Sequence, residues 1–174
     1  MRVDVVTLFP DLFAGFLATS FVARAALGGQ MSVRLRSPRE FGLGKHRSVD
    51  DTPYGGGSGM VMRVDVLVAA MESLDADAPQ GVRAHRILLS PQGAVLDQRK
   101  MREIAARDAV MLICGRYEGF DERVRAHVTE EISLGDFVMT GGEVAAMALV
   151  DGCSRLLPGV LGNAASILEE SHSP

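Results

Sequence analysis

Three short segments rich in glycine or proline contain the residue types best suited to hold a ligand. They are residues 90–93 (Ser-Pro-Gln-Gly), residues 115–119 (Gly-Arg-Tyr-Glu-Gly) and residues 135–142, and each follows an apolar run. At the carboxyl ends of strands in an open α/β sheet, such loops expose backbone N–H and C=O groups to ligands. Glycines also let the backbone approach a flat group closely. Each segment alone could be only a tight turn, but the three together favour a binding site.

Several well-known catalytic and phosphate-binding patterns are missing from the sequence. Residues 54–59 (Tyr-Gly-Gly-Gly-Ser-Gly) are rich in glycine but lack the Gly-Lys-Ser/Thr ending of a P-loop. No strand-like segment is followed by G-x-G-x-x-G at a helix start, so a dinucleotide site is poorly supported. H-E-x-x-H, paired C-x-x-C and G-x-S-x-G are also absent. Zinc hydrolysis and serine-esterase chemistry therefore lack their residues.

A cluster of basic side chains stands out against the net charge of −4. Residues 34–47 contain one acid, Glu40. The basic residues of this segment are Arg34, Arg36, Arg39, Lys45, His46 and Arg47. The segment could be a solvated loop, or an arm that contacts phosphates within an otherwise acidic protein. The composition leaves both interpretations open.

Cys114 and Cys153 are the two cysteines, and both have apolar neighbours. They are interpreted as buried thiols in a reducing cytoplasm, with a catalytic cysteine as the alternative. The longest apolar stretches, residues 110–114 and 144–150, are far shorter than the roughly 20 residues that span a bilayer. The N-terminus has no continuous apolar signal region. We therefore expect a cytoplasmic protein that does not associate with membranes.

The elements that would position these loops alternate between strands and helices. Strands are expected over residues 2–9, 31–35, 86–89, 110–114 and 131–134. Helices are expected after Pro10, around residues 21–27, and over residues 64–74, 98–107, 124–128 and 144–150. Residues 36–59 show no periodicity, and a loop of this length is more often functional than idle. The pattern predicts an α/β fold with a mostly parallel sheet and helices on both faces.

Six long motifs occur in one order along the chain. They occupy residues 6–10, 51–60, 89–93, 114–123, 133–143 and 155–163. In these motifs, and from Met1 to about Ser171, the sequence resembles the bacterial tRNA (guanine-N1-)-methyltransferases. These are SPOUT-class RNA methyltransferases that use S-adenosylmethionine. The resemblance implies a C-terminal deep trefoil knot in the catalytic domain, a rare departure from unknotted folds.

The resemblance also implies the domain organisation and the partners. Residues 1–168 would form the catalytic domain that binds S-adenosylmethionine, and residues 169–174 would begin an interdomain linker. A C-terminal tRNA-binding domain would follow beyond Pro174. The family acts on tRNA as a homodimer in which the partner chain completes each active site.

By the same resemblance, the cofactor lies against the three glycine-containing segments. The implied cofactor-binding residues are Leu89, Ser90, Pro91, Gln92, Gly93, Gly115, Tyr117, Glu118, Gly119, Ser133, Leu134, Gly135, Asp136, Phe137, Val138, Met139, Gly141 and Gly142. The implied substrate-binding residues are Tyr54, Gly59 and Arg155.

Methylation of guanine N1 requires removal of its proton and stabilisation of the charge that develops on O6. Glu170 matches the position of the family's proposed base, usually an aspartate, and Glu169 is the adjacent alternative. Arg155 matches the catalytic arginine, whose forked donors suit O6. Glu118 could contact the guanine or a Mg²⁺ ion, and Glu118 and Asp121 could equally be structural.

Two other functions remain as alternatives to the methylation of tRNA that the resemblance implies. One is a related SPOUT methyltransferase that acts on another RNA, although residues 54–59 and 115–123 favour the tRNA enzyme. The other is a dimeric module that binds the cofactor but is catalytically weak.

Overall fold

One parallel sheet organises the chain in the computed structural model, which describes residues 1–79 and 82–162. Its strands follow the order β2-β1-β6-β5-β7, and each neighbouring pair is parallel. The strands are β1 (Arg2–Val6), β2 (Ser32–Arg36), β5 (His85–Val95), β6 (Ala109–Cys114) and β7 (Glu130–Ser133). β3 (Asp50–Asp51) and β4 (Val61–Met62) form a separate antiparallel pair. The predicted α/β fold with a mostly parallel sheet is therefore confirmed.

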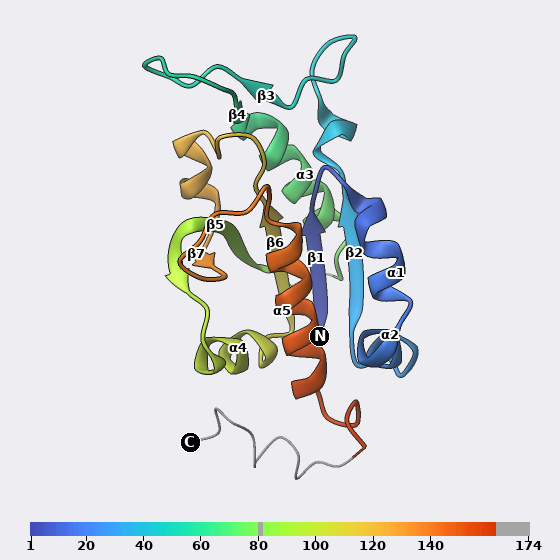
Figure 1. Cartoon of the computed structure of the whole chain (residues 1–174). Helices are drawn as coiled ribbons and strands as arrows, with labels where there is room; N and C mark the ends of the chain where they lie inside the picture. The colour runs from blue at the N-terminus through green and yellow to red at the C-terminus, as the bar shows by residue number, and fades with distance from the viewer. Residues whose placement is uncertain (80–81, 163–174) are drawn as a thin grey trace.

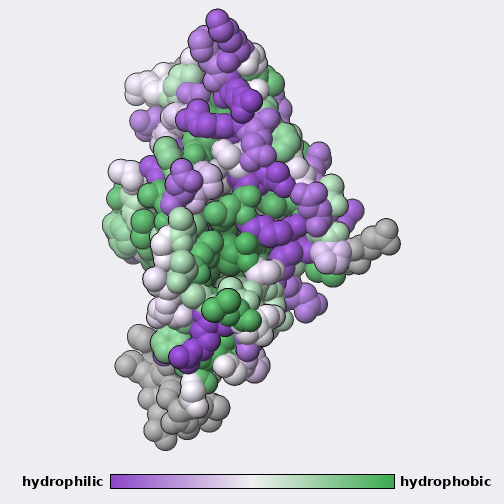
Figure 2. All heavy atoms as spheres, turned by 90° about the vertical axis from the view of Figure 1, so that its right-hand side faces the viewer, coloured by the Kyte–Doolittle hydropathy of each residue, from purple (hydrophilic) through white to green (hydrophobic). Residues whose placement is uncertain are grey.

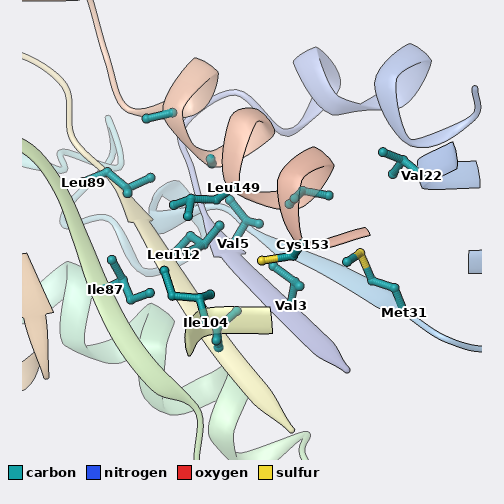
Figure 3. Packing of buried hydrophobic residues seen from close by; sticks show 14 of the residues in the cluster. Val3, Val5, Val22, Met31, Ile87, Leu89, Ile104, Leu112, Leu149 and Cys153 are labelled. Carbon is teal, nitrogen blue, oxygen red and sulfur yellow. The ribbon is translucent and has the colours of Figure 1, made fainter. Parts of the chain in front are cut away.

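Helices cover both faces of this sheet (Figure 1). One face carries α1 (Ala14–Leu17), α2 (Ser20–Leu27), α4 (Gln98–Ala105) and α5 (Glu143–Leu156), and the other carries α3 (Val64–Ala76). In Figure 3, Val3, Val5 and Leu112 of the strands pack toward Leu149 and Cys153 of α5. No helix in the described part of the chain has the length and apolar character needed to cross a bilayer.

The central strand β6 is buried along its whole length, as its continuous apolar run predicts. Val110, Leu112 and Cys114 pack on the side of α5, whereas Met111 and Ile113 pack on the side of α3. A strand covered on both faces has no position that tolerates a polar residue. Its carboxyl end is thereby fixed in the middle of the sheet, beside the glycine-containing segment 115–119.

Several boundaries differ from the sequence prediction. β1 ends at Val6 because the Thr7 hydroxyl accepts the N–H of Phe9 and begins a turn. The helix expected after Pro10 starts as the 3₁₀ helix η1 (Pro10–Phe13), and the helix expected over residues 124–128 is the 3₁₀ helix η3 (Glu122–His127). α5 extends to Leu156. The trefoil knot stays a prediction.

The segment of residues 90–93 is a loop within a strand and not the end of one. Leu89 and Ala94 of β5 both pair with Ile132 of β7, so the residues between them are excluded from the ladder. A Cβ atom on Gly93 would lie 2.4 Å from the backbone nitrogen of Ile132. Gly93 therefore allows β5 to rejoin β7, and the strand predicted to stop at Leu89 continues to Val95.

The region expected to be one long loop, residues 36–59, contains short elements. It includes the 3₁₀ helix η2 (Pro38–Phe41) and β3, which pairs with β4 to form an arm that projects at the top of Figure 1. Met62 of β4 donates its N–H to Gly119 O at 2.9 Å and accepts the N–H of Asp121 at 3.0 Å. The arm is thus hydrogen-bonded to the segment that follows β6.

The basic segment of residues 34–47 does not act as one unit. Arg34 binds the fully buried carboxylate of Asp4 at 2.6 and 2.9 Å and donates to Leu74 O at the end of α3. Arg36 forms ion pairs with Glu40 and Asp77. The interpretation of the whole segment as a phosphate-contacting arm is therefore wrong for these two arginines. The remaining basic residues, Arg39, Lys45, His46 and Arg47, are exposed.

Candidate functional site

A cavity of about 250 Å³ lies at the carboxyl edge of β5, β6 and β7. It is formed by the loop within β5, the turn after β6, η3, the end of β7, the loop of residues 134–142, and the first turn of α5. Its lining residues are Leu88, Leu89, Ser90, Pro91, Gln92, Gly115, Arg116, Tyr117, Glu118, Gly119, Phe120, Asp121, Glu122, Arg125, Glu131, Ile132, Ser133, Leu134, Phe137, Val138, Met139, Thr140, Gly141, Gly142 and Ala145. A pocket at this edge is where ligands bind in parallel α/β sheets.

The three glycine-containing segments that the sequence singled out therefore converge on one cavity. Of the residues assigned to the cofactor by resemblance, Gly93, Gly135 and Asp136 are the ones outside the lining. Gly93 has the packing role described above. Gly135 lies under the ring of Phe137, since a Cβ atom there would be 2.6 Å from Phe137 Cε1.

Two glycines bring the start of α5 against the end of β6. A Cβ atom on Gly142 would lie 2.8 Å from Cys114 Cα and 3.0 Å from Gly115 N. A Cβ atom on Gly115 would lie 2.7 Å from the ring of Phe120. The Gly142 N–H donates to Gly115 O at 3.0 Å. Close packing at the floor of the cavity therefore requires glycine at these two positions.

The turn after β6 holds a residue in an unusual backbone conformation. Tyr117 has φ 60°, in the left-handed region that a bulky side chain rarely adopts. The turn is held on the arm side, because Glu118 donates its N–H to Met60 O at 3.0 Å. Gly59 packs directly on Glu118, since a Cβ atom on Gly59 would lie 2.4 Å from Glu118 Cγ. Cavity and arm therefore share this turn.

The acidic side chains around the cavity differ in their surroundings. Asp121 accepts hydrogen bonds from Arg123, which lower the pKa of its carboxyl to about 2, and it caps η3. Glu131 pairs with Arg125 at 3.0 Å, and Arg125 also donates to Gln92 at 2.6 Å. The exposed Glu118 carboxylate makes no hydrogen bond or ion pair with the described residues. Asp121 is therefore engaged within the protein, whereas the Glu118 carboxylate has no partner among the described residues.

Arg155 does not reach this cavity within one protomer. Arg155 lies in the last turn of α5, whereas Glu143 begins the same helix beside the cavity. Twelve residues at 1.5 Å each separate them by roughly 18 Å. Glu170 and its alternative Glu169 lie outside the described residues. Tyr54 is fully exposed on the arm, and Gly59 contacts the cavity through Glu118.

Neither a metal site nor a reactive cysteine is evident near the cavity. In residues 1–79 and 82–162, no group of three or more histidine, cysteine, aspartate or glutamate side chains could hold a metal ion. Burial raises the pKa of the Cys153 thiol to about 12 and that of Cys114 well above its ordinary value. Both thiols are buried, which confirms the structural interpretation of the cysteines.

Sequence reasoning assigned no individual role to Thr7, Arg116 and Glu143, three polar residues that meet beside the cavity. Glu143 is 1% exposed, and its carboxylate accepts hydrogen bonds from the Thr7 hydroxyl and the Arg116 guanidinium at 2.9 Å each. The available signal was an acid directly after a glycine pair at the start of an apolar helix. Negative charge is favoured at that helix end.

The parallel sheet and its strand-end cavity define an α/β protein with a ligand-binding site at the carboxyl edge of its strands. The chain is similar to the solved structure described as "Crystal structure of tRNA (m1G37) methyltransferase from Aquifex aeolicus". The TM-score is 0.85 at 38% sequence identity, over 94% of this chain and 72% of that chain.

The sequence comparisons identify the family. The model of the family described as "tRNA (Guanine-1)-methyltransferase TrmD" matches residues 1–174. A Sorangium cellulosum tRNA (guanine-N(1)-)-methyltransferase is 66% identical, over all of this chain and 73% of its own length. A Gloeobacter violaceus protein of the same name is 55% identical, over 98% of this chain and 74% of its own length. The chain belongs to the TrmD family of tRNA (guanine-N1)-methyltransferases.

Proposed function

We propose that this protein transfers a methyl group from S-adenosylmethionine to N1 of the tRNA guanosine immediately 3′ of the anticodon. The observation that carries the proposal is the convergence of residues 89–92, 115–119, 133–134 and 137–142 on one cavity at the carboxyl edge of the sheet. The names of the relatives support the class of reaction. The Aquifex aeolicus protein is named a tRNA (m1G37) methyltransferase, which supports the position in the tRNA.

The residues of the cavity suit this cofactor. Leu89, Leu134 and Met139 offer apolar walls to an adenine ring, and the glycine backbone beside them offers hydrogen-bonding groups. Both the sulfonium and the amino group of S-adenosylmethionine are cationic. The unpaired carboxylate of Glu118 lies at the cavity and attracts positive charge. When bound, the cofactor supplies an activated methyl group, so no covalent enzyme intermediate is needed.

Guanine N1 carries a proton at neutral pH, and a base must take it within about 3 Å. We assign this role to Glu170, which is chemically equivalent to the family's aspartate but one methylene longer. Arg155 would donate to the guanine O6 as negative charge develops there. Arg155 is an exposed residue near the end of α5.

A second copy of the chain would bring these groups to the cavity. Arg155 lies roughly 18 Å along α5 from the cavity of its own protomer, so Arg155 of the partner subunit is the better candidate. Figure 2 shows hydrophobic side chains gathered at mid-height on the side of the molecule that carries α1 and α2. Phe9, Leu12 and Val144 are 43%, 53% and 59% exposed. Exposed apolar side chains of this size are typical of an interface.

Three measurements on the 174-residue chain test the proposal. Calorimetry should detect S-adenosylmethionine binding, and a tRNA transcript with guanosine 3′ of the anticodon should accept a methyl group. The matched control is the same transcript with adenosine at that position, which should accept none. Binding without methylation of either transcript would instead favour the cofactor-binding module. Light scattering should report a dimer, and a monomer at micromolar concentration would contradict the shared active site.

A further inference from the structure

Both oxygens of the buried Glu143 carboxylate accept hydrogen bonds. Its Oε1 accepts the Thr7 hydroxyl at 2.9 Å, and its Oε2 accepts Nε and Nη2 of Arg116 at 2.9 and 2.8 Å. Burying polar atoms is unfavourable unless they are hydrogen-bonded, so these partners offset the burial of a side chain that is 1% exposed. The Arg116 side chain is 21% exposed and lies at the edge of the cavity.

Arg116 joins three segments that are distant in sequence. Its guanidinium carbon lies 4.5 Å from the centre of the Phe9 ring, after β1. Its Nη1 donates to Thr140 O at 3.2 Å, in the loop that precedes α5. Its own backbone belongs to the turn after β6. All three guanidinium nitrogens are therefore engaged by the protein itself, which favours a role in holding loops over a role in binding ligand.

The turn that carries Arg116 needs such an anchor. The left-handed conformation of Tyr117 is unfavourable for a bulky side chain and persists only where the surroundings enforce it. The backbone of Gly115 is held by the Gly142 N–H, and that of Glu118 is held by Met60 O. The Arg116 side chain supplies the third restraint, at the centre of the strained turn.

We infer that Arg116 and Glu143 are a positioning pair that sets the spacing of the two cofactor loops, residues 115–119 and 134–142. The inference rests on the proposed function of the cavity as the S-adenosylmethionine site. Neither side chain contacts the reacting atoms in this role. Thr7 fixes the carboxylate of Glu143 from behind, which links the loop after β1 to the same arrangement.

The test measures the S-adenosylmethionine Kd and the Tm of Glu143→Gln, which keeps the shape of the side chain but removes its charge. We expect Kd to rise about tenfold, as loss of a typical coupled interaction would cause. The matched control is Asp4→Asn, which removes an equally buried carboxylate from its arginine, Arg34, outside the cavity. Both variants should lower Tm, but only Glu143→Gln should weaken binding. Unchanged binding by a destabilised Glu143→Gln would overturn the inference.

Arg116→Lys keeps the inference testable if Glu143→Gln does not fold, because an unchanged Kd of Arg116→Lys would also overturn it. Where both variants fold, they are combined in a double-mutant cycle. Arg116→Lys changes a partly exposed side chain, keeps the charge and loses the forked donors. It should also raise Kd, and the double variant should bind no more weakly than the weaker-binding single variant. If the increases in Kd of the two single variants multiplied in the double variant, Arg116 would contact the ligand independently. That result would overturn the inferred positioning pair. Failure of the wild-type chain to bind S-adenosylmethionine would instead refute the proposed function itself.

Discussion

The contact between the start of α5 and the end of β6 predicts that Gly142→Ala destabilises the protein. The added Cβ would lie 2.8 Å from Cys114 Cα, 3.0 Å from Gly115 N and 3.2 Å from Leu89 Cβ. Two of these atoms belong to the backbone, and Cys114 ends the fully buried strand β6, so the neighbours cannot simply rotate away. Overpacking of this kind costs about 1–3 kcal/mol.

The net change in the free energy of unfolding also includes an opposing effect in the unfolded chain. Replacing glycine by alanine reduces the conformational entropy of the unfolded state, which stabilises the folded protein by about 0.4–1 kcal/mol. We therefore expect Gly142→Ala to lower the free energy of unfolding by about 1–2 kcal/mol. For a chain of this size, Tm would fall by about 2–8 °C.

Urea and thermal unfolding, followed by circular dichroism, measure this change against a matched control. Gly15 lies in α1, has no positive φ, and a Cβ atom there would meet nothing within 4 Å. Gly15→Ala should therefore stabilise the protein by about 0.4–1 kcal/mol. If Gly142→Ala proved as stable as Gly15→Ala, the close packing of α5 on β6 would not be the reason for glycine at this position.

Three further predictions concern titration, thiol reactivity and activity. Because the pKa of Asp121 is lowered to about 2, its contribution to stability is present above its ordinary value of 3.8 and is lost as the pH falls toward 2. The urea midpoint of wild type should therefore fall more between pH 4 and pH 3 than that of Asp121→Asn, and equal slopes would contradict the Arg123 pairing. Since burial raises the pKa of both Cys114 and Cys153, iodoacetamide at pH 8 should label neither thiol until urea is added; rapid labelling of the folded chain would refute their burial. This chain covers 73% of the Sorangium cellulosum relative, and adding that relative's C-terminal segment should raise the rate of tRNA methylation. Glu170→Gln in the extended chain should abolish methylation. Equal rates with and without the added segment would show that it contributes nothing to tRNA binding or to the base.

The sequence determined the elements of the sheet because their signals are local. The apolar run of β6 predicts a strand covered on both faces, and the alternation of strands and helices predicts the parallel α/β class. The glycine-containing segments after these strands predict most of the residues that line the cavity. These inferences succeed because carboxyl ends of parallel strands must meet at one edge.

Contacts between residues distant in sequence were decided only by the tertiary structure. Arg34 was expected either in a solvated loop or on a phosphate-contacting arm, but β1 and β2 are adjacent and place it on the buried Asp4. The loop of residues 90–93 was expected to end a strand, but β5 resumes its pairing with β7 beyond it. Neither result follows from the residues that flank these segments.

The contacts of Glu143 with Thr7 and Arg116 show most clearly what local sequence determines and what only the tertiary structure decides. Each residue occurs in a recognisable motif, but Thr7 and Glu143 are 136 positions apart and Arg116 and Glu143 are 27 apart. Local sequence patterns determine which residues lie on loops and which lie in the core. Only the packing of β1, β6 and α5 around one cavity brings a hydroxyl, a guanidinium and a carboxylate within hydrogen-bonding distance, because that distance depends on the strand order.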